Sequence, residues 1–265
     1  MISPMPTTVV EGIRLAYVDK GSGDPVILLH GWGGQAASMM PLIVALETRY
    51  RVLAFDLPGF GESNPPPEPW GTPEYAEFVW KAAKSLGIVC ATYVGHSFGG
   101  RVAIWLAAHH PEAVQALVLI DAAGIRQPAT PGRRVRSFFY KAGKAVLRLP
   151  FWRSRTMALQ ERLATRFGSP DYRATSGVMR GTFVKTVTLD LLPCLPDIRV
   201  PTLLLWGDKD EETPLSDGKT MECLIPESRL IVVAGAGHFS YLDKPAFVGA
   251  VVSAFVDGTR GPKTT

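Results

Sequence analysis

The stretch Gly95-His96-Ser97-Phe98-Gly99-Gly100 decides the fold of this chain. The residues before it, 91–94, are few and mostly apolar, which is typical of a buried strand. The residues after it, 101–110, have the pattern of a helix that a proline ends. A strand that turns at once into a helix needs small residues where the two elements meet, and the glycines of this stretch meet that need. We therefore expect the hydroxyl of Ser97 to be held at a sheet edge above a helix N-terminus.

The spacing Gly-X-Ser-X-Gly in this stretch is the known pattern of a nucleophile elbow. The simpler alternative is a glycine-rich turn that only packs a helix on a sheet. The position of the pattern between a strand-like run and a helix-like run favours the elbow. His96 flanks the serine and is expected to point away from it.

Strand-like and helix-like segments alternate along most of the chain. We expect strands at residues 9–18 (two short strands of a hairpin), 25–30, 51–55, 91–94, 114–120, 201–206 and 229–233, and helices at 36–48, 72–86, 101–110 and 245–256. Continuous apolar runs are typical of strands that are covered on both faces. The sequence therefore predicts an α/β fold with a mainly parallel central sheet and helices on both faces.

The alternation is interrupted once, between residues 124 and 195, where no buried strand is evident. This segment mixes aromatic and basic residues and has helical character. We predict that residues 1–124 and 196–265 form the core of the protein. Residues 125–195 are predicted to form a helical cap that lies over the carboxyl edge of the sheet.

The basic residues concentrate in the predicted cap. Between Arg126 and Lys185 there are fourteen lysines or arginines and two acids, whereas the rest of the chain holds fourteen bases and twenty-two acids. No zinc-finger, helix-turn-helix or RNA-binding signature accompanies them, so we expect no nucleic-acid partner. A solvated basic face is the simpler interpretation. Contact with an anionic membrane through Arg133, Arg134 and Arg136 is the alternative.

The three cysteines, Cys90, Cys194 and Cys223, are far apart and form no Cys-X-X-Cys pair. They predict reduced thiols and neither a disulfide framework nor a zinc site. No apolar run approaches the length of a membrane span, and the N-terminus has no secretory signal pattern. We therefore expect a cytoplasmic protein.

The chain resembles the α/β-hydrolase fold superfamily over essentially its whole length. The matching segments are His30-Gly31-Trp32-Gly33-Gly34, Asp56-Leu57-Pro58-Gly59-Phe60-Gly61-Glu62-Ser63, Gly95-His96-Ser97-Phe98-Gly99-Gly100, Trp206-Gly207-Asp208-Lys209-Asp210 and Gly237-His238. They occur in the order of the superfamily, and an insertion stands where its cap usually lies. The resemblance implies a hydrolase that needs neither a cofactor nor a metal ion.

A serine hydroxyl needs a base within hydrogen-bond reach, and the base needs a carboxylate to fix its tautomer. Among five histidines, His238 follows a predicted strand and a glycine-rich loop that can return it to Ser97. In the pattern of the superfamily the acid falls on Asp210. Asp208, in the same turn, and Asp121, at the end of another predicted strand, are the alternatives.

Acyl transfer also needs hydrogen-bond donors for the negative charge that develops on the carbonyl oxygen. We expect the backbone N–H of Phe98, directly after the nucleophile, to be one of them. The backbone N–H of Trp32, in the loop after a predicted strand, is expected to be the other. The side chains of both residues are expected to help line an apolar pocket.

The leading interpretation is a serine carboxylesterase that acts on a small or medium ester, as a monomer or a homodimer. Ser97 argues against relatives that open epoxides or displace halides, because these attack with an aspartate. Carbon–carbon bond hydrolases of ring-cleavage products also use serine, but they often carry a tryptophan shortly after the histidine, where this chain has Phe239-Ser240-Tyr241-Leu242. A ligand receptor with slow hydrolysis is a further alternative.

Overall fold

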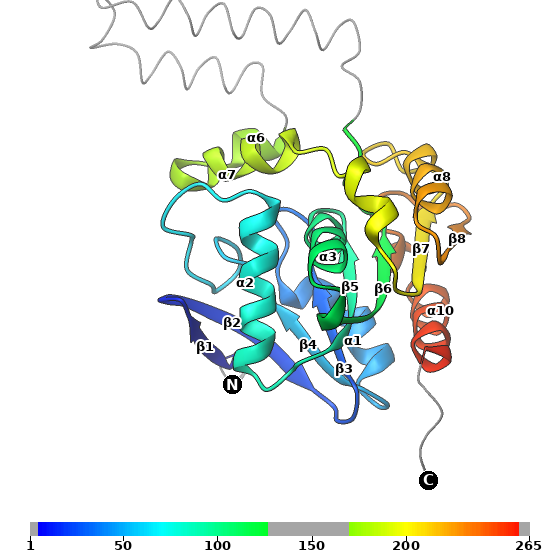
Figure 1. Cartoon of the computed structure of the whole chain (residues 1–265), viewed down its shortest axis with the longest axis horizontal. Helices are drawn as coiled ribbons and strands as arrows, with labels where there is room; N and C mark the ends of the chain where they lie inside the picture. The colour runs from blue at the N-terminus through cyan, green and yellow to red at the C-terminus, as the bar shows by residue number, and fades with distance from the viewer. Residues whose placement is uncertain (1–4, 127–169, 260–265) are drawn as a thin grey trace, which may run out of the picture.

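A computed structural model describes residues 5–126 and 170–259 of the chain (Figure 1). Its described residues form an eight-stranded sheet in the order β1-β2-β4-β3-β5-β6-β7-β8. Strands β1 and β2 run antiparallel to their neighbours, and β4, β3, β5, β6, β7 and β8 are parallel. The strands are β1 (Thr7–Val10), β2 (Ile13–Lys20), β3 (Pro25–Leu29), β4 (Arg51–Phe55), β5 (Ala91–His96), β6 (Val114–Ile120), β7 (Thr202–Gly207) and β8 (Ser228–Val233). The predicted α/β class with a mainly parallel sheet is confirmed.

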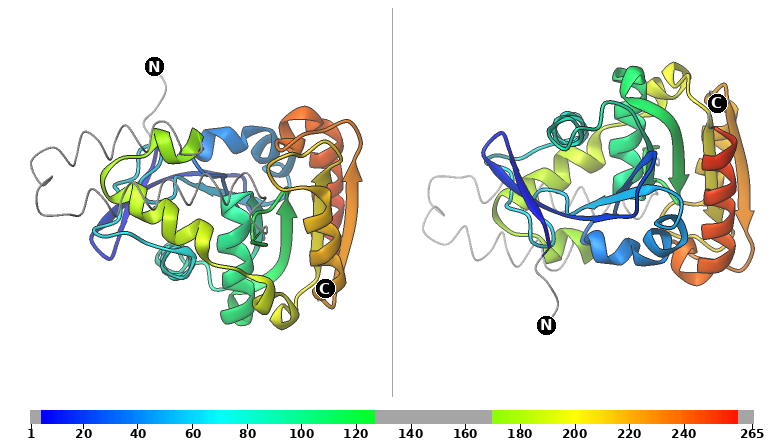
Figure 2. Two further views of the ribbon diagram at one scale, coloured as in Figure 1. Left: turned by 90° about the horizontal axis from the view of Figure 1, so that it is seen from above. Right: turned by 90° about the horizontal axis from the view of Figure 1, so that it is seen from below.

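Helices cover both faces of this sheet (Figure 2). They are α1 (Met40–Leu46), α2 (Thr72–Ser85), α3 (Phe98–His109), α6 (Pro170–Ala174), α7 (Gly177–Thr188), α8 (Leu215–Leu224), α9 (Ser240–Asp243) and α10 (Pro245–Gly258), with 3-10 turns at η1 (Ala36–Met39), η2 (Pro111–Ala113) and η4 (Leu192–Asp197). Helices α2, α3 and α8 pack on one face, and α1, α9 and α10 pack on the other. The helix predicted at residues 36–48 begins as a 3-10 turn, and Pro41 stands in the first turn of α1.

The central strands are buried on both faces, which explains their continuous apolar runs. In β3, Ile27 and Leu29 belong to the apolar cluster under α2 and α3. Their neighbours Val26 and Leu28 belong to the cluster under α1 and α10. Successive side chains of a strand point to opposite faces, so a strand covered twice needs an apolar residue at every position.

Much of the predicted cap, residues 127–169, lies outside the described residues, and Arg133, Arg134 and Arg136 are among them. Its later part forms α6 and α7, which lie beyond the upper end of the sheet in Figure 1. The ring of Phe183 in α7 packs on Trp32, in the loop after β3, at 5.0 Å between centroids. Helix α7 therefore covers the carboxyl edge of the sheet, as expected for a cap, while the boundaries of the cap remain a prediction.

No helix in the described parts of the chain combines the length and the apolar character that crossing a bilayer requires.

The approach of α3 to the sheet is too close for any side chain at two glycines. A Cβ on Gly95 would lie 2.5 Å from the carbonyl oxygen of Gly99. A Cβ on Gly99 would lie 2.1 Å from the carbonyl oxygen of Leu29 in β3. Both neighbours are backbone atoms of regular elements, so neither can move aside cheaply.

We expect Gly99→Ala to lower the free energy of unfolding by about 3 kcal/mol, because the new methyl group overlaps the backbone of β3. The matched control is Gly258→Ala, since a Cβ there meets no atom within 4 Å. Chemical denaturation measures both variants. Equal unfolding midpoints for the two would contradict the close approach.

Candidate active site

Ser97 lies between β5 and α3 with a φ of 49°, in the left-handed region that residues other than glycine rarely adopt. Its N–H donates to the carbonyl of Ile120 at 3.2 Å, and its own carbonyl accepts from the N–H of Ala123 at 3.1 Å. These two bonds attach the turn to the end of β6. A strained residue of this kind costs about 1–3 kcal/mol and persists only where its surroundings fix it.

The structure brings Ser97, His238 and Asp210 together. The Nε2 atom of His238 lies 2.9 Å from the Ser97 hydroxyl, and its Nδ1 atom lies 2.9 Å from a carboxylate oxygen of Asp210. An ionised carboxylate can only accept, so Nδ1 carries the proton and Nε2 is free to accept from the hydroxyl. This is the tautomer that a general base needs.

Asp210 is held by donors from its own turn. One oxygen accepts from the N–H groups of Glu212 and Thr213, at 2.8 and 2.9 Å. The other accepts from the hydroxyl of Thr213 at 2.7 Å, in addition to His238. Burial by itself raises the pKa of Asp210, but the bonds from His238 and Thr213 outweigh it and leave the pKa below its usual value. Asp210 therefore stays ionised at neutral pH.

His238 is 8% exposed, and burial by itself lowers its pKa. The hydrogen bond that His238 donates to Asp210 and the negative charges of Asp210, Glu212 and Asp121 outweigh burial, so the pKa lies above its usual value. A carboxylate oxygen of Glu212 is 3.5 Å from Nε2, and its side chain is largely exposed. The raised pKa favours the protonated imidazole and so makes it easier for Nε2 to accept a proton.

The two alternative acids contact other groups. Asp208 accepts from the N–H of Gly235 at 2.7 Å. Asp121 accepts from the N–H of Gly207 at 2.8 Å and from the N–H and the hydroxyl of Ser240 at 3.0 and 2.6 Å. Neither carboxylate is hydrogen-bonded to His238, so the geometry favours Asp210 as the partner of the imidazole.

The Phe98 amide directly follows Ser97, and the Trp32 amide belongs to the loop after β3. The loop after β3 rests against the nucleophile turn, because Gly99 donates to the carbonyl of His30 at 3.0 Å and a Cβ on Gly31 would lie 3.4 Å from Cβ of Ser97. Within the described parts of the chain, neither the Trp32 nor the Phe98 amide is hydrogen-bonded to another residue. Both therefore remain available as donors.

His96 has a contact that the sequence did not indicate. Its Nε2 lies 2.8 Å from the carbonyl oxygen of His238. Burial lowers the pKa of His96 to about 3, so the ring is neutral and Nε2–H donates this bond. His96 thus supports the backbone of His238, and only its place beside Ser97 in the sequence could have suggested this.

Aromatic side chains surround the loop after β3. The ring of Trp32 makes edge-on contacts with Phe60, Phe98 and Phe183, at centroid distances of 4.9, 5.2 and 5.0 Å. A cavity of about 270 Å³ adjoins this group under α6 and α7, lined by Trp32, Gly33, Gly59, Phe60, Ala174, Thr175, Ser176 and Met179. An uncharged organic group fits such a lining.

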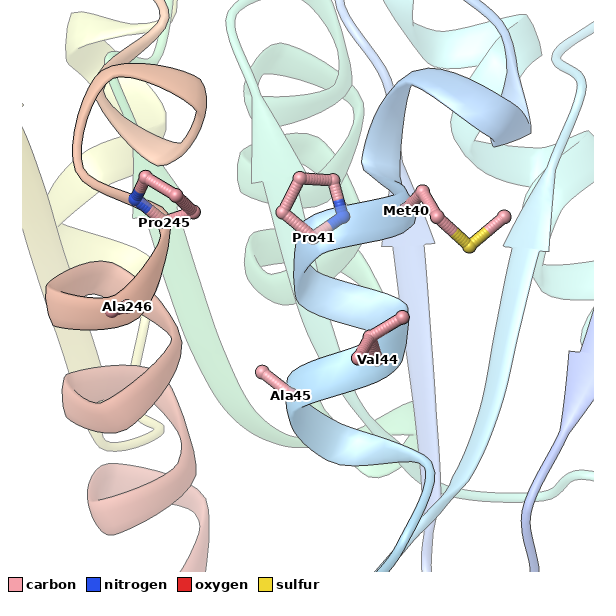
Figure 3. Close-up of a pocket in the computed structure, with 6 residues that line it drawn as sticks. All are labelled: Met40, Pro41, Val44, Ala45, Pro245 and Ala246. Carbon is pink, nitrogen blue, oxygen red and sulfur yellow. The ribbon is translucent and has the colours of Figure 1, made fainter.

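A second hollow, of about 450 Å³, lies between α1 and α10 (Figure 3). Its lining is Met40, Pro41, Val44, Ala45, Pro245 and Ala246, none of which can donate or accept a proton. This hollow has no groups for chemistry, and the candidate site is therefore the cluster around Ser97.

In the part of the chain that the structure describes, no group of three or more histidine, cysteine, aspartate or glutamate side chains is arranged to hold a metal ion. The expectation of a reaction without metal or cofactor remains a prediction.

Comparison with known proteins gives consistent results. The family model described as "alpha/beta hydrolase fold" matches residues 24–245. A 2-hydroxymuconate semialdehyde hydrolase of Pseudomonas putida is 30% identical, over 92% of this chain and 91% of that protein. A pimeloyl-[acyl-carrier protein] methyl ester esterase of Edwardsiella ictaluri is 28% identical, over 88% of this chain and 93% of that protein. A solved membrane phospholipase A, described as a bacterial virulence factor, superposes with a TM-score of 0.76 and 29% identity, over 97% of this chain and 87% of that one.

Glu212→Gln is expected to lower the pKa of His238, because it removes a negative charge that favours the protonated imidazole. An NMR titration of the His238 ring measures this directly, and the midpoint should move to lower pH. Glu211→Gln, at the neighbouring exposed glutamate, is the matched control and should leave the midpoint in place. Equal midpoints in wild type and Glu212→Gln would contradict the contact.

Proposed function

This chain belongs to the alpha/beta hydrolase fold family as a hydrolase of that fold, and on this premise we propose that it is a serine carboxylesterase. Its substrates are small to medium carboxylic esters. The observation that carries the proposal is the imidazole of His238, which lies within 2.9 Å of both the Ser97 hydroxyl and the Asp210 carboxylate. A nucleophile, a base and a group that orients the base are the parts that acyl transfer needs.

In the first half of the proposed reaction, the Ser97 oxygen attacks the ester carbonyl while Nε2 of His238 takes the hydroxyl proton. Asp210 stabilises the imidazolium through Nδ1–H. The carbonyl oxygen becomes an oxyanion, which the amides of Trp32 and Phe98 bind. Each such donor contributes about 3–4 kcal/mol to the transition state. The bond to the alcohol then breaks, and the alcohol leaves with the proton from His238.

In the second half, water attacks the acyl group on Ser97 while His238 takes a proton from it. The ester bond to the serine breaks, the hydroxyl of Ser97 regains its proton, and the carboxylic acid leaves. Because the same imidazole serves both halves, its pKa must allow it to gain and lose a proton readily. The opposing effects of burial and Asp210 on His238 meet this need.

The hydrolysis of a ring-cleavage product is the second candidate, and the relative from Pseudomonas putida favours it. The same nucleophile and base serve both reactions, so the local electrostatics must decide. A substrate that carries its own carboxylate near the base would meet the exposed charge of Glu212, 3.5 Å from Nε2 of His238. Like charges repel, so the carboxylate of Glu212 beside His238 favours a neutral ester over a substrate with a negative charge near the base.

Replacing the nucleophile tests the mechanism. We expect Ser97→Ala to lower kcat for p-nitrophenyl butyrate by at least about 10³-fold, because removal of the nucleophile leaves only binding and the oxyanion donors. The matched control is Ser85→Ala, at an exposed serine of α2 whose hydroxyl donates to the carbonyl of Ala82 in the same helix, and it should keep the wild-type rate. A Ser97→Ala variant that is as fast as wild type would exclude the proposed nucleophile.

A substrate panel tests the reaction class. We expect kcat/KM for neutral p-nitrophenyl esters with short and medium acyl chains to exceed that for 2-hydroxymuconate semialdehyde by about 100-fold, a ratio that pocket contacts can supply. Release of p-nitrophenol and loss of the absorbance of the dienoate measure the two reactions. The opposite ranking would establish the second candidate and exclude the first.

A further inference from the structure

We propose that Asp121 and Ser240 form a clamp that positions His238 against Ser97 and Asp210. The clamp consists of the carboxylate of Asp121, at the end of β6, and the backbone and hydroxyl of Ser240, two residues after the base. The proposal rests on the function proposed above and adds positioning residues to it. Neither residue contacts the reacting atoms, so both act through His238.

The clamp joins three separate segments. One oxygen of Asp121 accepts from the N–H of Gly207 at 2.8 Å, at the end of β7. The other accepts from the N–H and the hydroxyl of Ser240 at 3.0 and 2.6 Å. The carbonyl of Asp121 accepts from the hydroxyl of Thr213 at 3.1 Å, and that hydroxyl also contacts Asp210 at 2.7 Å. Asp121 is thus bonded both to the turn that holds Asp210 and to the segment that holds His238.

The same end of β6 also holds the nucleophile. The carbonyl of Ile120 accepts from the N–H of Ser97, and the N–H of Ala123 donates to the carbonyl of Ser97. Residues on both sides of Asp121 are therefore bonded to the nucleophile turn, while the side chain of Asp121 is bonded to the loop of the base. The distance of 2.9 Å between Nε2 of His238 and the Ser97 hydroxyl depends on this frame.

The carboxyl group of Asp121 lowers the stability of the folded state. Asp121 is fully buried, with a φ of 46°, and no cation forms an ion pair with it in the described parts of the chain. Burial raises its pKa to about 6, the bonds from Ser240 and Gly207 oppose this, and the charge of Asp210 adds to it. A carboxyl group whose pKa is raised in the folded state weakens the fold as pH rises through that pKa.

A residue chosen only for packing would avoid this cost. The charge has a further effect, since Asp121 raises the pKa of His238 together with Asp210 and Glu212. Among the described residues, the buried ring of His96, which is neutral, also lies against the base. Burial, backbone strain and five hydrogen bonds at one residue near His238 point to a positioning role for Asp121 rather than a role in stability.

Two substitutions distinguish the effect of the clamp on the position of His238 from the effect of the Asp121 charge on its pKa. Asp121→Asn keeps the shape of the side chain but removes its negative charge. Its NH₂ group would face the donors of Gly207 or Ser240, so the clamp is weakened. Ser240→Ala removes one hydrogen bond and keeps the charge. With p-nitrophenyl butyrate we expect kcat to fall about 10- to 100-fold in Asp121→Asn and less in Ser240→Ala, with KM within about twofold, because a small displacement of the base impairs the chemical step.

The pH profile gives a readout that a merely structural role would not move. Activity rises with pH as His238 loses its proton, and the rise should occur at lower pH in Asp121→Asn because a negative charge near the imidazole is gone. In Ser240→Ala the rise should stay in place. Asp19→Asn is the stability control. It disrupts the two hydrogen bonds that Arg51 of β4 donates to Asp19 of β2, away from the site. It should lower the melting temperature and keep kcat.

Labelling of Ser97 by a p-nitrophenyl alkylphosphonate, measured by release of p-nitrophenol and by mass spectrometry, tests the proposed function and the clamp separately. Wild type that is not labelled at Ser97 would overturn the proposed function. Wild type that is labelled, with Asp121→Asn and Ser240→Ala labelled at the same rate and with an unchanged pH profile, would overturn the clamp alone. Slower labelling in both variants supports it. If Asp121→Asn fails to fold, the kcat and labelling rate of Ser240→Ala decide.

Discussion

The candidate site depends on one steric constraint, the close approach of α3 to the ends of β5 and β3. Side chains at Gly95 or Gly99 would overlap backbone atoms at 2.5 and 2.1 Å. Where the chain turns from β5 into this helix, Ser97, midway between the two glycines, has a positive φ. Ser97 is therefore the fixed point of the site, and the acid and the base are placed relative to it.

Local sequence patterns predicted the elements well, because the physics that forms them is local. The continuous apolar runs at 25–30 and 51–55 became β3 and β4, which are buried on both faces. The motifs shared with the α/β-hydrolase fold superfamily selected Ser97, Asp210 and His238, and the structure brings these side chains within hydrogen-bond distance. That they act as a catalytic triad remains a proposal.

Contacts between distant segments could not be read from the sequence. The chain order does not reveal that β3 lies between β4 and β5, nor that the end of β6 meets the loop after β8. The roles of Asp121 and His96 follow from such lateral neighbours, since their partners Ser240 and His238 are more than a hundred residues away. A single sequence carries no signal for these pairings, whereas a motif such as Gly-X-Ser-X-Gly is complete within five residues.

The order of the elements along the chain also bears on how the protein matures. Ser97 follows β5, whereas the imidazole that faces it follows β8, which comes last in sequence among the eight strands and lies at an edge of the sheet. A ribosome-bound chain that has folded only its N-terminal half therefore exposes a serine without its base. Contacts of such long sequence separation form slowly, so we expect the hydroxyl of Ser97 and the imidazole of His238 to meet only when β8 docks on the sheet.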